Sequence, residues 1–252
     1  MTDNHVHIGQ FCETWYEPLE VLGIVTEAGI TDVVYSSTTS GKDEVRYKEI
    51  EHEIREVTAE YPPDKMEPFF WYIPPYIDEG ITIENAFQNL PYGGIKLHPR
   101  CHRWNLQDRK HLDCLHTLFG SAQDSGVPIL IHTGEDDFEK PAFFEQFIAE
   151  YRDVRCILAH CRPVLETIAM FRTYKNVYGD TAFLPEANLQ KIIQAGFGER
   201  LFLGTDFPIT HYFTRGNTET NEPAITLEQQ YKKDTAVLQK YEIILAGSTE
   251  RN

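Results

Sequence analysis

The sequence predicts one α/β domain over residues 1–252, folded as a single (β/α)8 TIM barrel. Short apolar, β-branched runs alternate with longer stretches of helical period, and eight of each can be counted along the chain. The strand-like runs begin roughly every 22 to 34 residues, the spacing that (β/α)8 crossover units require. These runs are continuously apolar, which indicates a parallel sheet covered on both faces. A doubly wound sheet is less favoured, because Gly9 stands alone where a nucleotide-binding loop would carry several glycines.

The strands are predicted from short runs rich in Val, Ile, Leu and aromatic residues. Glycine or proline stands beside several of them, as at Gly94, Pro99 and Gly126, and marks where regular structure stops. The predicted strands span residues 3–8, 32–36, 67–73, 94–99, 127–132, 154–160, 176–180 and 200–206.

Helical period and end signals predict a helix after each strand. Leu19, Leu22 and Val25 lie on one side of the first helix, which stops at Gly29. Asp43 is the expected N-cap of the second helix, and Pro163 is expected to open the sixth. The predicted helices span residues 15–28, 43–57, 83–90, 106–124, 138–151, a segment that starts at 163, 185–195 and 226–245.

Composition narrows the classes of function. The formal net charge is -16, and an acidic surface repels phosphate backbones, so nucleic acid is not an expected partner. The five cysteines are odd in number and scattered, which favours free thiols in a reducing, cytoplasmic setting. No apolar stretch approaches the roughly 20 residues that span a bilayer, so we expect no membrane contact. The expected partner is a small-molecule substrate, and a homo-oligomer is compatible with this fold.

The first strand carries the first chemical signal, His5-Val6-His7. Side chains at i and i+2 of a strand leave the same face, so both imidazoles point one way and can meet a metal ion. A chance pair exposed to solvent would bind nothing, so this spacing alone is weak evidence.

Further polar residues close other predicted strands, and in a (β/α)8 barrel these strand ends face one mouth, where active sites lie. Five of the ten histidines are at such ends, whereas His52, His111 and His116 fall in helices. The residues that we expect to meet at the mouth are His5, His7, Lys96, His98, His132, His160 and Asp206.

In this order, the strings Lys96-Leu97-His98-Pro99, His132-Thr133-Gly134 and Thr205-Asp206-Phe207-Pro208 make the chain similar to the amidohydrolase superfamily. The closest resemblance is to the branch that contains aminocarboxymuconate-semialdehyde decarboxylase and its hydrolase relatives. The resemblance implies a metal-dependent hydrolase with His5, His7, His132 and Asp206 as metal ligands. Asp206 would also accept a proton, and His160 would bind a second metal or orient substrate and water. Zinc is the expected metal, as one ion or two, with other divalent transition metals left open.

Lys96 allows three interpretations. It is carboxylated and bridges two metals in binuclear members of the superfamily; as a free ammonium group it would attract an anionic substrate, assisted by His98; or its stem simply packs while its head reaches solvent. We favour a mononuclear site with an unmodified lysine. A nuclease of the TatD type would carry a glutamate at this strand end, and its absence argues against DNA hydrolysis.

Arginines in the loops indicate an anionic substrate. Arg100, Arg103 and Arg162 follow the fourth and sixth strands and could clamp a carboxylate or phosphate, or could instead pair with the acidic loop 135–137. Three functions stay open: a hydrolase acting on a small anionic amide, lactone or ester, a non-oxidative decarboxylase using the same metal site, and a metal-binding barrel without catalysis.

Overall fold

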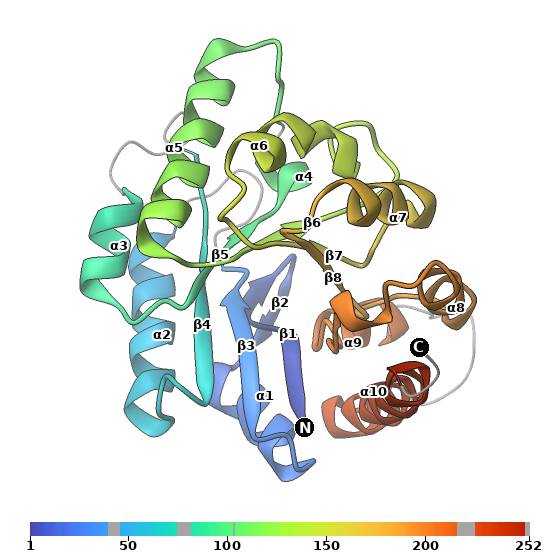
Figure 1. The fold of residues 1–252 in the computed structure, drawn as a ribbon. Coiled ribbons are helices and arrows are strands. Elements are labelled where there is room, and N and C mark those ends of the chain that lie inside the picture. Colours follow the sequence, from blue (N-terminus) through green and yellow to red (C-terminus); the bar gives the residue numbers. More distant parts are fainter. Residues whose placement is uncertain (40–45, 75–81, 103, 216–224, 250–252) are drawn as a thin grey trace.

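Eight parallel strands form a closed barrel in the computed structural model, which describes residues 1–39, 46–74, 82–102, 104–215 and 225–249 (Figure 1). The sheet order among these residues is β2-β1-β3-β4-β5-β6-β7-β8-β9, and all pairs except β1 with β2 are parallel. The strands are β1 (Thr2–Phe11), β2 (Thr14–Tyr16), β3 (Asp32–Ser37), β4 (Met66–Trp71), β5 (Gly94–Leu97), β6 (Ile129–His132), β7 (Cys156–Ala159), β8 (Val177–Asp180) and β9 (Leu201–Phe202). The predicted (β/α)8 barrel is therefore confirmed.

The barrel closes beside the first strand, through the segment that follows β9. Asn4 N donates to Leu203 O at 2.8 Å, Asp206 N donates to His5 O at 2.7 Å, and His7 N donates to Phe207 O at 2.7 Å. The backbone hydrogen bonds that close the barrel thus involve His5, His7 and Asp206 themselves. Closing the barrel therefore also brings these three side chains together.

Helices follow the strands and cover the outside of the barrel (Figure 1). Their ends use ordinary capping: Asp108 accepts from Lys110 N before α5, and Gly126 follows that helix at φ 69°, a conformation that favours glycine. The helices are α1 (Pro18–Glu27), α2 (Tyr47–Glu60), α3 (Ile83–Asn89), α4 (Pro99–His102), α5 (Arg109–Ser125), η1 (Pro141–Phe144), α6 (Glu145–Glu150), α7 (Val164–Thr173), α8 (Glu186–Gln194), η2 (Gly198–Arg200), α9 (Ile209–Arg215) and α10 (Leu227–Thr249).

Several predicted bounds are wrong. The sequence predicts the eighth strand over 200–206, but the regular strand ends at Phe202, because beyond it the chain pairs with β1 only through separate contacts such as Leu203 O with Asn4 N and Phe207 O with His7 N. The helix expected over 138–151 is divided into η1 and α6, and β2, α4 and α9 are additional. Asp43, the expected N-cap, lies outside the described residues; the described cap of α2 is Arg46.

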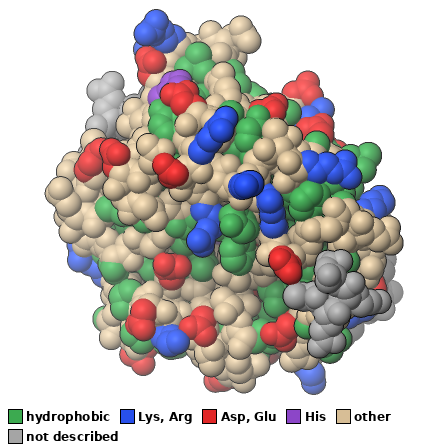
Figure 2. Space-filling model, in the orientation of Figure 1, with side chains coloured by type: hydrophobic (Ala, Val, Ile, Leu, Met, Phe, Trp, Pro, Cys, Tyr) green, Lys and Arg blue, Asp and Glu red, His purple; other side chains and the backbone are tan. Residues whose placement is uncertain are grey.

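The core of the barrel is apolar, and charged side chains lie on its surface. Ile8, Ile95, Ile131 and Leu158 are fully buried in strands, in the continuous apolar pattern that parallel sheets require. Acidic and basic side chains are interspersed over the face drawn in Figure 2. Within the described ranges, every helix is too short or too polar to cross a membrane.

Candidate metal centre

Three predicted ligands converge where the barrel closes. His5 and His7 come from β1, and Asp206 follows β9. The two histidine Nε2 atoms lie 3.2 Å apart, and Asp206 Oδ1 lies 3.3 Å from His5 Nε2 and 2.9 Å from His7 Nε2. All three side chains are buried. We call His5, His7 and Asp206 the three-donor group.

The contacts at Nδ1 of His5 and His7 bear on which nitrogen of each ring carries the proton. His5 Nδ1 lies 2.7 Å from Asp180 Oδ2, and His7 Nδ1 lies 3.3 Å from the Ser36 carbonyl oxygen. A carboxylate oxygen only accepts hydrogen bonds, so His5 Nδ1 donates to Asp180 and the neutral His5 ring keeps its lone pair on Nε2. The Ser36 hydroxyl lies nearer to His7 Nδ1, at 3.0 Å, and because a hydroxyl can donate or accept, these contacts are compatible with either tautomer of His7. Burial lowers the pKa of His7 to about 4, so this ring is uncharged at neutral pH.

The three-donor group therefore brings two imidazole Nε2 atoms and a carboxylate oxygen together, and the lone pair of His5 Nε2 faces into the group. Burial by itself raises the pKa of Asp206, but His5 and His7 outweigh it and hold that pKa well below its usual range. When His7 Nε2 also carries a lone pair, three electron-rich atoms at such short separations repel one another unless a cation lies between them. Tetrahedral zinc with Zn–N bonds of about 2.0–2.1 Å separates its ligand atoms by about 3.3 Å, close to the spacing in this group. The residues fit a divalent metal.

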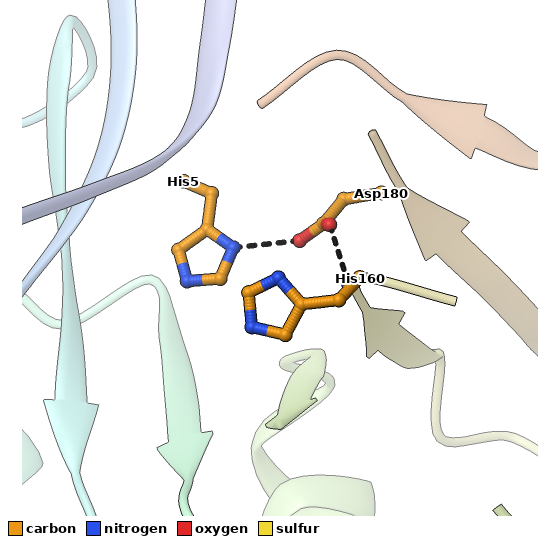
Figure 3. A group of neighbouring side chains, drawn as sticks. All are labelled: His5, His160 and Asp180. Carbon is orange, nitrogen blue, oxygen red and sulfur yellow. Dashed lines mark hydrogen bonds and ion pairs between the residues drawn. The ribbon is translucent and has the colours of Figure 1, made fainter. Parts of the chain in front are cut away.

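Asp180 closes β8, at a position where the sequence allows it either to orient a ligand or to make a local hydrogen bond. Its Oδ2 accepts from His5 Nδ1, and its Oδ1 accepts from His160 N at 2.8 Å and Ala182 N at 3.1 Å (Figure 3). Although burial by itself raises the pKa of Asp180, His5 and His160 hold it below the usual value. The carboxylate is thus ionised and fully engaged, in the arrangement by which acidic residues orient metal-binding histidines. Its position at the end of a strand was the available signal.

His5, His160 and Asp180 form a second set of converging donor atoms (Figure 3). His160 Nδ1 lies 3.0 Å from Ala182 O, so it donates there and leaves the lone pair on Nε2. That Nε2 lies 3.1 Å from His132 Nδ1, which must then be the donor. Burial lowers the pKa of His160 to about 4, so the ring is neutral.

His132 contacts His160 rather than the three-donor group in this structure. Its other nitrogen, Nε2, lies 3.8 Å from Glu139 Oε1, and its ring stacks on His98 with centroids 3.9 Å apart. A metal bond from His132 Nδ1 would require breaking the hydrogen bond to His160. Glu139, buried beside this ring, was not singled out from the sequence because it lies in a loop of many acids.

Lys96 points into the centre and is fully buried. Its Nζ donates to His5 Nε2 at 2.8 Å, the same lone pair that a metal ion would use. Burial lowers the pKa of Lys96 to about 8. The interpretation of Lys96 as a lysine whose head reaches solvent is therefore wrong, because the barrel interior encloses the whole side chain.

The backbone around the site is unusual at several positions. His160 and Asp206 adopt φ 68° and φ 64°, a region that non-glycine residues rarely occupy. A Cβ atom on Gly204 would lie 2.8 Å from His5 Cβ, so only glycine lets the segment before Asp206 approach β1 this closely.

Asp3 on β1 is hydrogen-bonded to Thr205, in the segment before Asp206, and to Tyr231 on α10. Its Oδ1 accepts from Thr205 N at 3.0 Å, and its Oδ2 accepts from Thr205 Oγ1 at 2.7 Å and from the Tyr231 hydroxyl at 3.0 Å. Burial raises the pKa of Asp3 to about 6 despite these hydrogen bonds.

The predicted arginines behave differently from one another. Arg100 is mostly exposed and lies 3.9 Å from both Asp136 and Glu139, a weak pairing of the kind expected with loop acids. Arg162 lies with its guanidinium 5.9 Å from the centre of the Phe183 ring and donates to Phe183 O at 3.5 Å. In the part of the chain that the structure describes, no carboxylate forms an ion pair with Arg162. Arg103 lies outside the described residues.

Comparisons with known proteins support a relationship along most of the chain. A family model described as Amidohydrolase matches residues 28–240, a range that begins after His5 and His7. The comparison with curated protein sequences returned no match.

Solved structures of low sequence identity share the fold. A probable 2-pyrone-4,6-dicarboxylic acid hydrolase from Acinetobacter baumannii has a TM-score of 0.61 and 13% identity over 97% of this chain and 94% of its own. The 5-carboxyvanillate decarboxylase of Sphingomonas paucimobilis has a TM-score of 0.60 and 11% identity over 100% and 98%. A zinc-bound amidohydrolase from Burkholderia multivorans has a TM-score of 0.58 and 10% identity over 95% and 90%. Because the family model spans well over half of the sequence, the chain belongs to the amidohydrolase family of metal-dependent enzymes.

Proposed function

We propose that this protein hydrolyses an amide, lactone or ester bond in a small anionic compound at a mononuclear zinc site. The observation that carries the proposal is the three-donor group: His5 Nε2, His7 Nε2 and Asp206 Oδ1, buried and 2.9–3.3 Å apart, with His5 Nδ1 held by the Asp180 carboxylate. His132 is the proposed further ligand, after a change in its contact with His160.

A divalent ion held there supplies Lewis acidity, which polarises a carbonyl oxygen and acidifies water. Asp206, ionised at neutral pH, accepts the proton from the attacking water and passes it to the leaving group. His160, neutral and fixed by Ala182 O, orients water or substrate with its Nε2 lone pair once His132 has turned away.

The anionic character of the substrate is proposed from two cationic groups. Lys96 must leave His5 Nε2 when a metal binds there, and its ammonium group then becomes available to a substrate anion. The guanidinium of Arg162 carries five donors, and among the described residues its side-chain contacts are the Phe183 ring and a long hydrogen bond of 3.5 Å to Phe183 O. His98, which follows β5 and stacks on His132, would assist Lys96 in binding the substrate anion.

Non-oxidative decarboxylation is the second candidate for the same site. The observation that favours it is the equal likeness to structures of both kinds: TM-scores of 0.61 for the probable hydrolase and 0.60 for the 5-carboxyvanillate decarboxylase. Both reactions would use the same ion and the same anion-binding groups, so the products must distinguish them.

Metal analysis tests the shared premise. We expect one zinc per chain in purified protein, and loss of most bound metal in His5→Ala and in Asp206→Asn. His52→Ala, which removes an exposed histidine on α2, is the matched control and should bind metal normally. Metal binding that is undiminished in both site variants would refute the site.

Substrate screening then separates the reactions. Lactones, amides, esters and aromatic carboxylates are incubated with zinc-loaded protein, and acid release is measured against CO₂ release. Acid release without CO₂ supports hydrolysis, and CO₂ release supports decarboxylation. Activity that persists after complete chelation of the metal would contradict both.

A further inference from the structure

A pocket of about 410 Å³ lies between α9 and α10, next to the metal centre but formed by different residues. Its walls come from Phe213 on α9, from Asp234, Val237 and Leu238 on α10, and from the loop after β8. The two helices lie side by side in Figure 1 and contact each other. The volume falls within the range of about 300–1,000 Å³ typical of small-molecule sites.

Exposed apolar side chains gather at this pocket. Among the described residues, six large hydrophobic side chains are strongly exposed, and three of them line it: Phe183 at 38%, Phe213 at 64% and Val237 at 48%. Leu238 and Tyr241 continue the apolar wall and are buried. A concentration of exposed apolar surface around one concavity is typical of a binding site.

The polar side of the pocket is acidic and already ordered. Asp234 Oδ2 accepts from Thr210 Oγ1 at 2.6 Å, and its Oδ1 accepts from Gln230 Nε2 at 2.7 Å. The hydroxyl of Thr214 lies 3.0 Å from Gln230 Oε1 and also contacts the Thr210 carbonyl oxygen. The described partners that position this carboxylate, Thr210 and Gln230, are both uncharged.

Among the described residues, the pocket lining supplies no positive charge to balance Asp234. No lysine or arginine is among the described residues that line the pocket. Burial, together with the nearby carboxylates of Asp3 and Asp206, raises the pKa of Asp234 to about 6. A cation beside Asp234 would relieve this accumulation of negative charge, and the faces of Phe183 and Phe213 also favour a cation.

We propose that the pocket between α9 and α10 binds a small organic cation: a primary amine whose ammonium group contacts Asp234 and whose apolar body packs against Phe213, Val237 and Leu238. This second site is independent of the reaction at the metal centre. It also touches Gly204 and Thr205, the residues that precede Asp206, so an occupant would contact the segment that carries a metal ligand.

Ligand-observed NMR titration of the zinc-loaded full chain tests the proposal. The probes are benzylamine and benzyl alcohol, which have similar shapes but differ in charge at pH 7.5. We expect benzylamine to bind at least fivefold more tightly, and Asp234→Asn to remove this difference while leaving benzyl alcohol binding within twofold. Asparagine keeps the size and much of the hydrogen bonding of Asp234, and circular dichroism and Tm confirm that the variant is folded.

A second pair of variants tests the location. Val237→Trp fills the pocket and should weaken both probes at least fivefold, whereas Ile243→Trp is the matched control. Ile243 is 72% exposed on the same helix and does not line the pocket, so its replacement should leave both affinities within twofold.

Three results would overturn the proposal: no measurable binding of benzylamine, equal affinity for the two probes, or full benzylamine affinity in Asp234→Asn. In the last case, loss of binding in His5→Ala would show that the amine coordinates the metal instead. Because the decisive comparison does not use catalysis, a failure of the proposed hydrolase function leaves its outcome unchanged.

Discussion

Asp180→Asn provides the sharpest test of how the metal centre is built. Asparagine retains an oxygen that can accept from His160 N and Ala182 N, now 2.8 and 3.1 Å from Asp180 Oδ1. Its amide nitrogen then faces His5 Nδ1, where the carboxylate now lies at 2.7 Å. Two donors cannot share this contact, so the His5 proton would move to Nε2 and block the lone pair that faces the metal.

The expected magnitude follows from the indirect role of Asp180. Loss of a residue that orients a metal-binding histidine typically reduces metal affinity 10- to 100-fold, or about 1.4–2.7 kcal/mol. We expect this loss for Asp180→Asn, measured by zinc competition with a chelating dye at pH 7.5. Asp124→Asn, which changes an exposed acid on α5, is the control and should bind zinc as the unmodified protein does.

A comparison of histidine variants distinguishes this role from direct coordination by Asp180. If the ion lies in the three-donor group, His7→Ala should lose much more affinity than His160→Ala. The reasoning is refuted if folded Asp180→Asn binds zinc within twofold of the unmodified protein. It is equally refuted if His160→Ala loses as much affinity as His7→Ala, because the ion would then lie among His5, His160 and Asp180.

Three further predictions concern neighbouring residues. Lys96→Met removes the ammonium group that competes for His5 Nε2, so zinc affinity measured by competition should rise several-fold; a fall would indicate a carboxylated, metal-bridging lysine. Gly204→Ala places a Cβ atom 2.8 Å from His5 Cβ, and should lower the free energy of unfolding by about 1–3 kcal/mol in urea and weaken zinc binding; unchanged values would contradict the tight approach. The raised pKa of Asp3, from 3.8 to about 6, means that the folded state holds a proton that the unfolded state releases, so this group stabilises the fold less as the pH rises through this window. Asp3→Asn removes this dependence, so between pH 4 and pH 7 its stability should improve relative to the unmodified protein by up to about 3 kcal/mol in urea titrations; a constant difference would show that Asp3 titrates normally.

Much of the architecture could be predicted from local pattern. Continuous apolar runs, helical period and end signals such as Gly126 depend on neighbours within a few residues, and they located all eight parallel strands. Because parallel strand ends meet at one mouth, the prediction that His5, His7 and Asp206 lie together required only the barrel and their positions along the chain. The bounds failed where tertiary contacts override local preference, as after Phe202, where pairing with β1 replaces regular strand structure.

The sequence by itself determined the fold class, the alternation of strands and helices, and the group of residues that faces the mouth, because these depend on short-range periodicity and on which residue ends each strand. Only the tertiary structure decided which side chains contact one another. Asp180 accepts a hydrogen bond from His5, 175 positions away, His132 contacts His160 rather than the three-donor group, and Lys96 donates to the lone pair of His5. Such contacts depend on side-chain direction, burial and hydrogen-bond geometry between distant segments. No local pattern carries that information, because each contact exists only once the barrel has closed.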